Sequence, residues 1–135
     1  MININNIPIY YNLGIIRKTG KPRRIPLNLN WYRNAHYMQS NNVKKLVFEW
    51  FKLNVTELPI LERIGEIEYT VYRARNNRAD LDNFGSVVAK FCNDALVEIG
   101  LIPDDSTKYI KRIGLVDGGI DKENPRADLK IITLK

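Results

Sequence analysis

The sequence predicts a single α+β domain in which two main helices pack on a mixed β-sheet. A chain of 135 residues suits one domain with a buried core and is too short for two. Its 44% hydrophobic and 27% charged residues are ordinary globular values. The spacing of apolar residues also changes several times between two and about 3.6, in the order β-β-α-β-α-β-β.

The first third of the chain is predicted to contain short strands followed by a helix. Residues 7–16 and 24–29 are rich in Ile, Leu and Tyr and are broken by glycine and proline, which is typical of strands or a hairpin. Residues 28–40 are predicted as a loop that leads into a helix capped by Ser40 or Asn41. The helix ends before Pro59, and its apolar residues are Val43, Leu46, Val47, Trp50 and Leu53.

The second half begins with a strand and a second helix. From Glu62 onward the apolar residues Ile67, Tyr69 and Val71 alternate with polar ones, which indicates a strand with one buried face. Residues 83–99 return to helical spacing, with Asp82 as the expected N-cap and Gly100 as the stop. The apolar stripe of this helix is Phe84, Val87, Val88, Phe91, Ala95 and Ile99.

The C-terminal part is predicted to form two more strands. They cover residues 107–116 and 128–134 and are separated by a loop at Gly118 and Gly119. With them the chain contains enough strands for one sheet that carries both helices.

Positive charge is concentrated in the N-terminal third. The net charge is +6, and residues 1–45 contain eight Lys and Arg but no Asp or Glu. The other ninety residues contain thirteen basic and all fifteen acidic side chains. This asymmetry predicts a polyanionic partner held beside a carboxylate site, the alternative being a solvated basic face.

The sequence carries no sign of secretion or membrane insertion. Its single cysteine, Cys92, cannot form an internal disulfide and is expected to be a buried small hydrophobe. No apolar run approaches the roughly 18 residues of a membrane span, and the N-terminus lacks the layout of a signal peptide. We therefore expect a cytoplasmic protein without a membrane partner.

Acidic residues flank the second helix. Asp80 and Asp82 stand two apart at the expected end of a strand, where extended geometry would point both carboxylates to one side. Converging carboxylates are the ligands that Mg²⁺ prefers. Asp104 and Asp105 occupy the turn after the helix and would add to the site. Alternatively, Asp82 is only a cap and the later pair only turn residues after a proline.

Helical geometry connects further residues to the acids. At 100° per residue, Asn83, Lys90 and Asp94 share one stripe of the helix. A lysine beside carboxylates would neutralise negative charge that develops on a phosphate. The alternative is an ordinary i,i+4 ion pair between Lys90 and Asp94, which contributes a few tenths of a kcal/mol.

Aromatic residues and the only histidine lie before the first helix. Trp31, Tyr32 and Tyr37 are interleaved with Arg33, which suits either stacking on unpaired bases or filling of the core. His36 has two interpretations as well. It would contact a phosphate or act in catalysis, or it is an exposed or helix-capping residue.

The acidic segment resembles a known signature. Its elements are Asp80-Leu81-Asp82-Asn83, Lys90, Asp94-Ala95-Leu96 and Asp104-Asp105. This pattern, over about 26 residues, resembles the RusA family of Holliday-junction resolvases (crossover junction endodeoxyribonucleases), which are common in phages and prophages. Looser similarity extends to the Asn-and-aromatic segment 28–36 and to Arg73, Arg75 and Arg78.

The resemblance implies a metal-dependent enzyme that cuts four-way DNA as a homodimer in recombination and repair. Asp80, Asp82 and Asp105 would bind Mg²⁺, with Mn²⁺ as a substitute, and Lys90 would be the fourth catalytic residue. Supporting positions would be Asn30, His36, Asn83, Asp94 and Asp104. The basic residues expected to hold DNA are Arg23, Arg24, Arg33, Lys44, Lys45, Arg73, Arg75 and Arg78.

The chain departs from the family pattern in two places. The interval from Asn83 to Lys90 is four residues longer than in the shortest members, which moves the lysine about 6 Å along the helix axis. Residues 1–23 are additional and form an N-terminal hairpin or arm of the single domain 1–135. Two other functions fit the same residues: a non-catalytic binder of DNA junctions, and a nuclease for flaps or other branched DNA.

Overall fold

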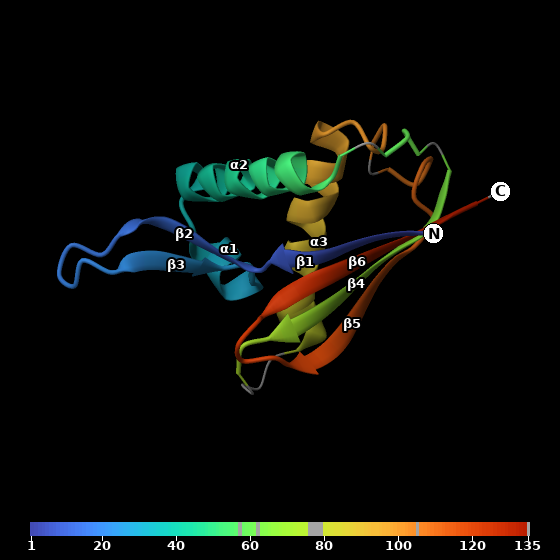
Figure 1. Ribbon diagram of the computed structural model, residues 1–135. Coiled ribbons are helices and arrows are strands. Elements are labelled where there is room, and N and C mark those ends of the chain that lie inside the picture. The colour runs from blue at the N-terminus through green and yellow to red at the C-terminus, as the bar shows by residue number, and fades with distance from the viewer. Residues whose placement is uncertain (57, 62, 76–79, 105, 135) are drawn as a thin grey trace.

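The computed structural model describes residues 1–56, 58–61, 63–75, 80–104 and 106–134. The chain forms a mixed sheet with helices packed on it, which confirms the predicted α+β class (Figure 1). The strands are β1 (Ile2–Pro8), β2 (Tyr10–Ile15), β3 (Pro22–Pro26), β4 (Ile64–Arg73), β5 (Ile113–Ile120) and β6 (Arg126–Thr133). The helices are α1 (Leu29–Asn34), α2 (Tyr37–Asn54) and α3 (Leu81–Glu98).

The main sheet has the strand order β1-β6-β4-β5. β6 is antiparallel to both β1 and β4, whereas β4 and β5 are parallel. α3 packs against β4 and β5, and α2 in turn packs against α3. A parallel pair needs a crossover connection, and α3 lies in that connection between β4 and β5.

The core lies between the sheet and α3. The predicted alternation in β4 is confirmed, because Ile67, Tyr69 and Val71 are all fully buried. Burial raises the pKa of Tyr69 well above its usual value, and the Tyr69 hydroxyl donates a hydrogen bond to the buried Asn93 of α3. Cys92 is fully buried, as expected.

The N-terminal end of α3 differs from the prediction, whereas its C-terminal end agrees with it. Asp80, not Asp82, occupies the N-cap position, so the predicted cap is wrong by two residues. At the other end Gly100 has φ +80°, and the amides of Gly100 and Leu101 donate to the carbonyls of Val97 and Leu96. This is a Schellman motif, which confirms Gly100 as the stop.

Residues 29–34 and 37–40 are helical where a loop was predicted. The Asn28 side chain accepts a hydrogen bond from the Trp31 amide and caps α1. His36 caps α2, because its Nδ1 accepts from the Met38 amide at 3.2 Å. The predicted caps Ser40 and Asn41 are therefore wrong, since two adjacent local caps allow the helices to begin earlier.

The buried face of α2 also differs in part. Val43, Val47 and Phe51 are fully buried at four-residue intervals, whereas Leu53 is 80% exposed. Leu53 was expected in the apolar stripe, but it lies in the last turn of α2 and does not reach the core.

Gly118 and Gly119 belong to β5 and do not form the predicted loop. The pairing of β5 with β4 passes from Val71↔Asp117 to Tyr72↔Gly119, so Gly118 is the extra residue of a β-bulge. A Cβ atom at Gly118 would lie 2.7 Å from the Tyr72 ring, and Gly119 has φ +97°. The glycines are needed because the strand bends here beside an aromatic ring.

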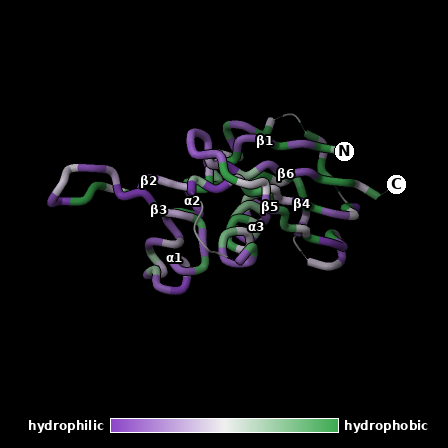
Figure 2. Tube along the Cα trace, turned by 90° about the horizontal axis from the view of Figure 1, so that it is seen from below, coloured by the Kyte–Doolittle hydropathy of each residue, from purple (hydrophilic) through white to green (hydrophobic). Residues whose placement is uncertain are grey.

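β2 and β3 form a separate two-stranded sheet, which confirms a hairpin near the N-terminus. Figures 1 and 2 show this hairpin projecting away from the main sheet. Among the described residues, no helix is long and apolar enough to cross a membrane.

We expect Gly118→Ala to destabilise the protein, because its Cβ atom would press on the Tyr72 ring, which also stacks with the Arg126 guanidinium at 3.9 Å from the ring centroid. Overpacking of this kind costs about 1–3 kcal/mol, measurable by urea unfolding. Gly114→Ala is the matched control, since its nearest neighbour, at 3.2 Å, is the end of the flexible Glu66 side chain. Equal losses in the two variants would contradict the expectation.

Candidate functional site

The acidic pair Asp80 and Asp82 stands at the N-terminus of α3, and both residues are exposed. The Asp80 backbone is extended and its carbonyl accepts a hydrogen bond from the Asn83 amide at 2.9 Å. Its carboxylate makes no capping hydrogen bond. Among the described residues, neither acid has an ion-pair partner. The Asp80 carboxylate therefore occupies a capping position without acting as a cap.

Asp82 lies in the first turn of α3. The expectation that both acids project from one side of an extended strand is wrong, because helical geometry already begins at Leu81. Two acids here are favourable for the helix, whose N-terminus carries partial positive charge. This favourable interaction with the helix N-terminus leaves the carboxylates able to bind a metal ion, because it involves no specific hydrogen bond to their oxygens.

A basic cleft with a volume of about 630 Å³ lies next to this helix end. We define it by four cationic side chains, three amides and an apolar floor that includes Phe84. The cations are Arg24, Arg73, Arg75 and Lys122, and the amides are Asn28, Asn30 and Asn83. Asn83 directly follows Asp82, so the cleft begins one residue from the acidic pair, although neither Asp80 nor Asp82 lines it.

Two of the four cations of the cleft, Arg73 and Arg24, are held by packing. Arg73, at the end of β4, lies 4.6 Å from the Phe84 ring centroid, and its Nη2 is 3.6 Å from an Asp117 carboxylate oxygen. The Arg24 guanidinium stacks 3.9 Å from the centroid of the Tyr10 ring. Stacking restricts both side chains, so less conformational entropy is lost when they bind an anion.

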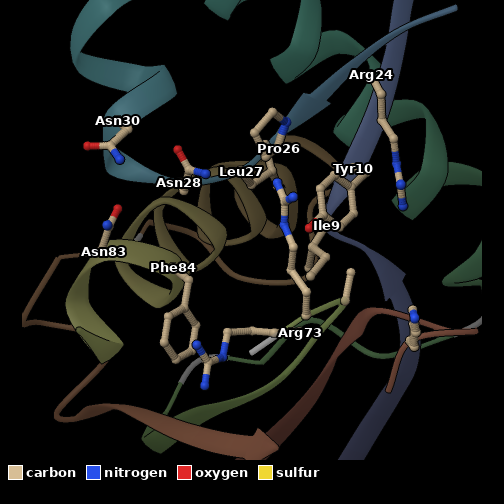
Figure 3. A pocket seen from close by; sticks show the side chains of 13 residues that line it. Ile9, Tyr10, Arg24, Pro26, Leu27, Asn28, Asn30, Arg73, Asn83 and Phe84 are labelled. Atoms are coloured by element: carbon tan, nitrogen blue, oxygen red, sulfur yellow. The ribbon is translucent and has the colours of Figure 1, made fainter. Parts of the chain in front are cut away.

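The amides lie together on one side of the cleft (Figure 3). The Asn83 side-chain oxygen accepts from the Leu29 amide at 3.2 Å and thereby joins α3 to the start of α1. Asn28 uses its own oxygen to cap α1. Each amide group also carries two N–H donors, the kind of group that hydrogen-bonds phosphate oxygens.

Asp105, the predicted third acid, lies outside the described residues. The predicted DNA-binding residue Arg78 also lies outside them. Asp104 lines a second hollow of about 490 Å³ together with Asp94 and Glu98, toward the other end of α3. Among the described residues, the structure brings no three His, Cys, Asp or Glu side chains into a group that could hold a metal ion.

Lys90 and Asp94 do not pair with each other among the described ion pairs. Asp94 pairs instead with Lys44 of α2, at 3.8 Å. Lys90 is exposed and lies about 12 Å along the helix axis from Asp82 at 1.5 Å per residue. The structure therefore places the lysine on the same helix as the acidic pair, but two turns away from it.

Of the aromatic residues predicted either to stack on bases or to fill the core, two pack against the core and one is exposed. Trp31 and Tyr32 pack edge-on against Phe91, with centroids at 5.9 and 5.7 Å, and belong to the core. Tyr37 is 67% exposed, and its ring lies 4.5 Å from that of His36. His36 is both exposed and a helix cap, as one of the two interpretations held.

The predicted basic residues lie in several places. Arg24, Arg73 and Arg75 line the cleft, whereas Lys44 and Lys45 line the second hollow. Arg23 and Arg33 are exposed, on β3 and α1. Sequence reasoning missed Lys122, because it lies in the β5–β6 connection and no local pattern places that connection beside α3.

No protein-family model matches the chain, and no curated protein matches it either. The proposed function therefore depends on the residues of the acidic pair and the basic cleft, together with the sequence resemblance described above.

We expect Asn83→Ala to destabilise the fold by about 0.5–1.5 kcal/mol, the usual net contribution of one hydrogen bond, because the Leu29 amide loses its acceptor. Asn83→Asp keeps an acceptor oxygen at this position and should retain most of the stability. Asn42→Ala, at an exposed position of α2, controls for helix propensity. Thermal unfolding of the three variants measures the difference, and equal midpoints for Asn83→Ala and Asn42→Ala would contradict it.

Proposed function

We propose that this protein is a Mg²⁺-dependent endodeoxyribonuclease of the RusA type, which cuts four-way DNA junctions as a homodimer. One observation carries the proposal: two exposed carboxylates stand at the start of α3, and Asn83, the residue after the second of them, lines a cleft with four cationic side chains. Acids and cations side by side are what hydrolysis of a polyanion requires, because the substrate must be held close to carboxylates that would otherwise repel it.

The acidic pair fits a divalent cation. Asp80 and Asp82 offer exposed oxygen ligands that no ion pair among the described residues occupies, and oxygen ligands suit Mg²⁺. Asp105 would be the third ligand by the family resemblance. When bound, the ion would lower the pKa of a water molecule and polarise the phosphoryl oxygen.

The residues of the cleft would bind and orient the DNA. Arg24, Arg73, Arg75 and Lys122 would pair with backbone phosphates, and the neighbouring asparagines would donate hydrogen bonds to their oxygens. Arg73 is held between Asp117 and Phe84, so it would fix the position of a phosphate relative to the acidic pair. Lys90, two turns along α3, would contact DNA about 12 Å from the acidic pair along the helix axis.

We expect Asp80→Asn and Asp82→Asn each to reduce junction cleavage in Mg²⁺ by more than about 10²-fold, since even residues that only support metal ligands cost 10–100-fold. Junction binding should be unchanged or tighter, because each variant removes a negative charge beside the phosphates. Glu98→Gln is the matched control, an exposed acid at the opposite end of the same helix. Cleavage of a labelled synthetic junction and a gel-shift assay provide the two measurements.

The same assays separate the alternatives. Paired symmetric nicks that vanish with chelator, together with a dimer in sedimentation, would support the proposal. A protein that shifts the junction with or without Mg²⁺ and never nicks it is a non-catalytic junction binder. Cleavage of a flap but not of the junction would assign a different branched substrate. Wild-type cleavage by Asp82→Asn would overturn the metal site.

A further inference from the structure

The β2–β3 hairpin is the most exposed part of the described chain. It forms a two-stranded sheet of its own and stands away from the body of the molecule in both views (Figures 1 and 2). Every residue from 14 to 24 is exposed. The hairpin is not part of the main sheet. Formation of that sheet therefore does not explain why the hairpin projects from the molecule.

The hairpin is strongly and uniformly basic. Five cations lie within eight residues, Arg17, Lys18, Lys21, Arg23 and Arg24, and the first acidic residue of the chain is Glu49. Like charges at this density repel one another. A surface of this kind is stabilised by an anionic partner, and it disfavours self-association through the same face.

Hydrogen bonds within the tip define the shape of the hairpin. The Ile16 amide donates to the Lys21 carbonyl at 2.8 Å, and the Gly20 amide donates to the Ile16 carbonyl at 2.8 Å. Gly20 has φ +68°, a conformation that favours glycine. At the base, Tyr11 and Ile25 are paired and buried in the core. The hairpin is thus shaped before binding, which reduces the entropy lost when it meets a partner.

The basic surface continues into the cleft. In the hairpin register Tyr10 faces Pro26 and Asn12 faces Arg24, so these residues share one face. Tyr10, Arg24 and Pro26 all line the basic cleft. A polyanion that occupies the cleft therefore meets further cations along the hairpin.

We propose that the β2–β3 hairpin is a DNA-binding arm that contacts the phosphate backbone of duplex DNA leading away from the basic cleft. The proposal rests on the proposed function only in placing DNA in the cleft. From Pro26 to Pro22 the strand β3 extends about 13 Å at 3.3 Å per residue. One DNA strand places a phosphate about every 3.4 Å along the helix axis, so the arm spans several phosphates. A two-stranded β-ribbon also fits the major groove.

The test removes charge from the arm and, separately, from the far side of the molecule. The arm variant carries Arg17→Gln, Lys18→Gln, Lys21→Gln and Arg23→Gln, all at exposed positions. The control carries Lys52→Gln, Arg63→Gln, Lys108→Gln and Lys111→Gln, also at exposed positions. Lys52 lies in the last turn of α2, and the other three lie in the connections before β4 and β5, which Figure 1 shows at the end of the molecule opposite the hairpin. Both variants lose four positive charges, so they differ in where the charge is lost.

The measurement is the affinity for a linear duplex and for a four-way junction at several salt concentrations, without Mg²⁺. Each lost phosphate contact reduces the slope of log K against log salt by about 0.9. We expect the arm variant to lose up to about 3.6 in slope, so that wild-type affinity falls about 10²-fold more between 50 and 200 mM salt. The control variant should keep nearly the wild-type slope, and both should melt like wild type.

Equal salt slopes in the arm and control variants would overturn the proposal that the hairpin binds DNA. A changed sedimentation coefficient with an unchanged slope would also overturn it, and would assign the exposed Ile15 and Ile16 at the tip to contact with a second copy. If wild type binds DNA through the arm but never cuts the junction, the arm stands and the nuclease proposal fails. If wild type binds neither DNA, both proposals fail.

Discussion

The packing of α3 against β4 and β5 is the constraint on which the rest of the structure depends. Ten residues of α3 are buried, and its one buried polar side chain, Asn93, is satisfied by the Tyr69 hydroxyl of β4. An unpaired amide at this depth would cost about 1–3 kcal/mol, so the bond fixes how the helix lies on the sheet. Because α3 cannot rotate or slide without breaking this contact, its N-terminus is held beside the ends of the strands.

That placement explains why the acidic pair and the basic cleft lie at the same end of α3. Arg73 ends β4, Arg24 comes from β3, and Lys122 follows β5. The acids begin α3, where the helix N-terminus tolerates negative charge. Cations alone would bind a polyanion without cleaving it, and acids alone would repel it. The proposed hydrolysis of DNA therefore needs both the cations and the acids. Their proximity is a property of the fold, since the residues are far apart in the sequence.

The hairpin and the second hollow show how differently the basic residues are used. The hairpin cations have no acidic neighbours in the sequence and adjoin the cleft through Arg24. Lys44, by contrast, lies 3.8 Å from Asp94 and faces a surface of mixed charge. A count of positive charge in the N-terminal third does not distinguish these environments. Only neighbouring elements decide whether a cation is balanced within the molecule or turned toward a partner.

The sequence by itself determined the fold class, the burial of β4 and α3, and Gly100 as the stop of α3, because these follow from periodicity and from local backbone conformation. It also indicated the acidic pair and the basic arginines. Tertiary structure decided the rest. The helix begins at Leu81, which changes how Asp82 projects. Gly118 lies in a strand, and the Tyr72 ring occupies the space that a Cβ atom there would need. Lys122 reaches the cleft only through the path of the chain after β5. The features of Gly118 and Lys122 depend on contacts between distant segments, which no local pattern encodes.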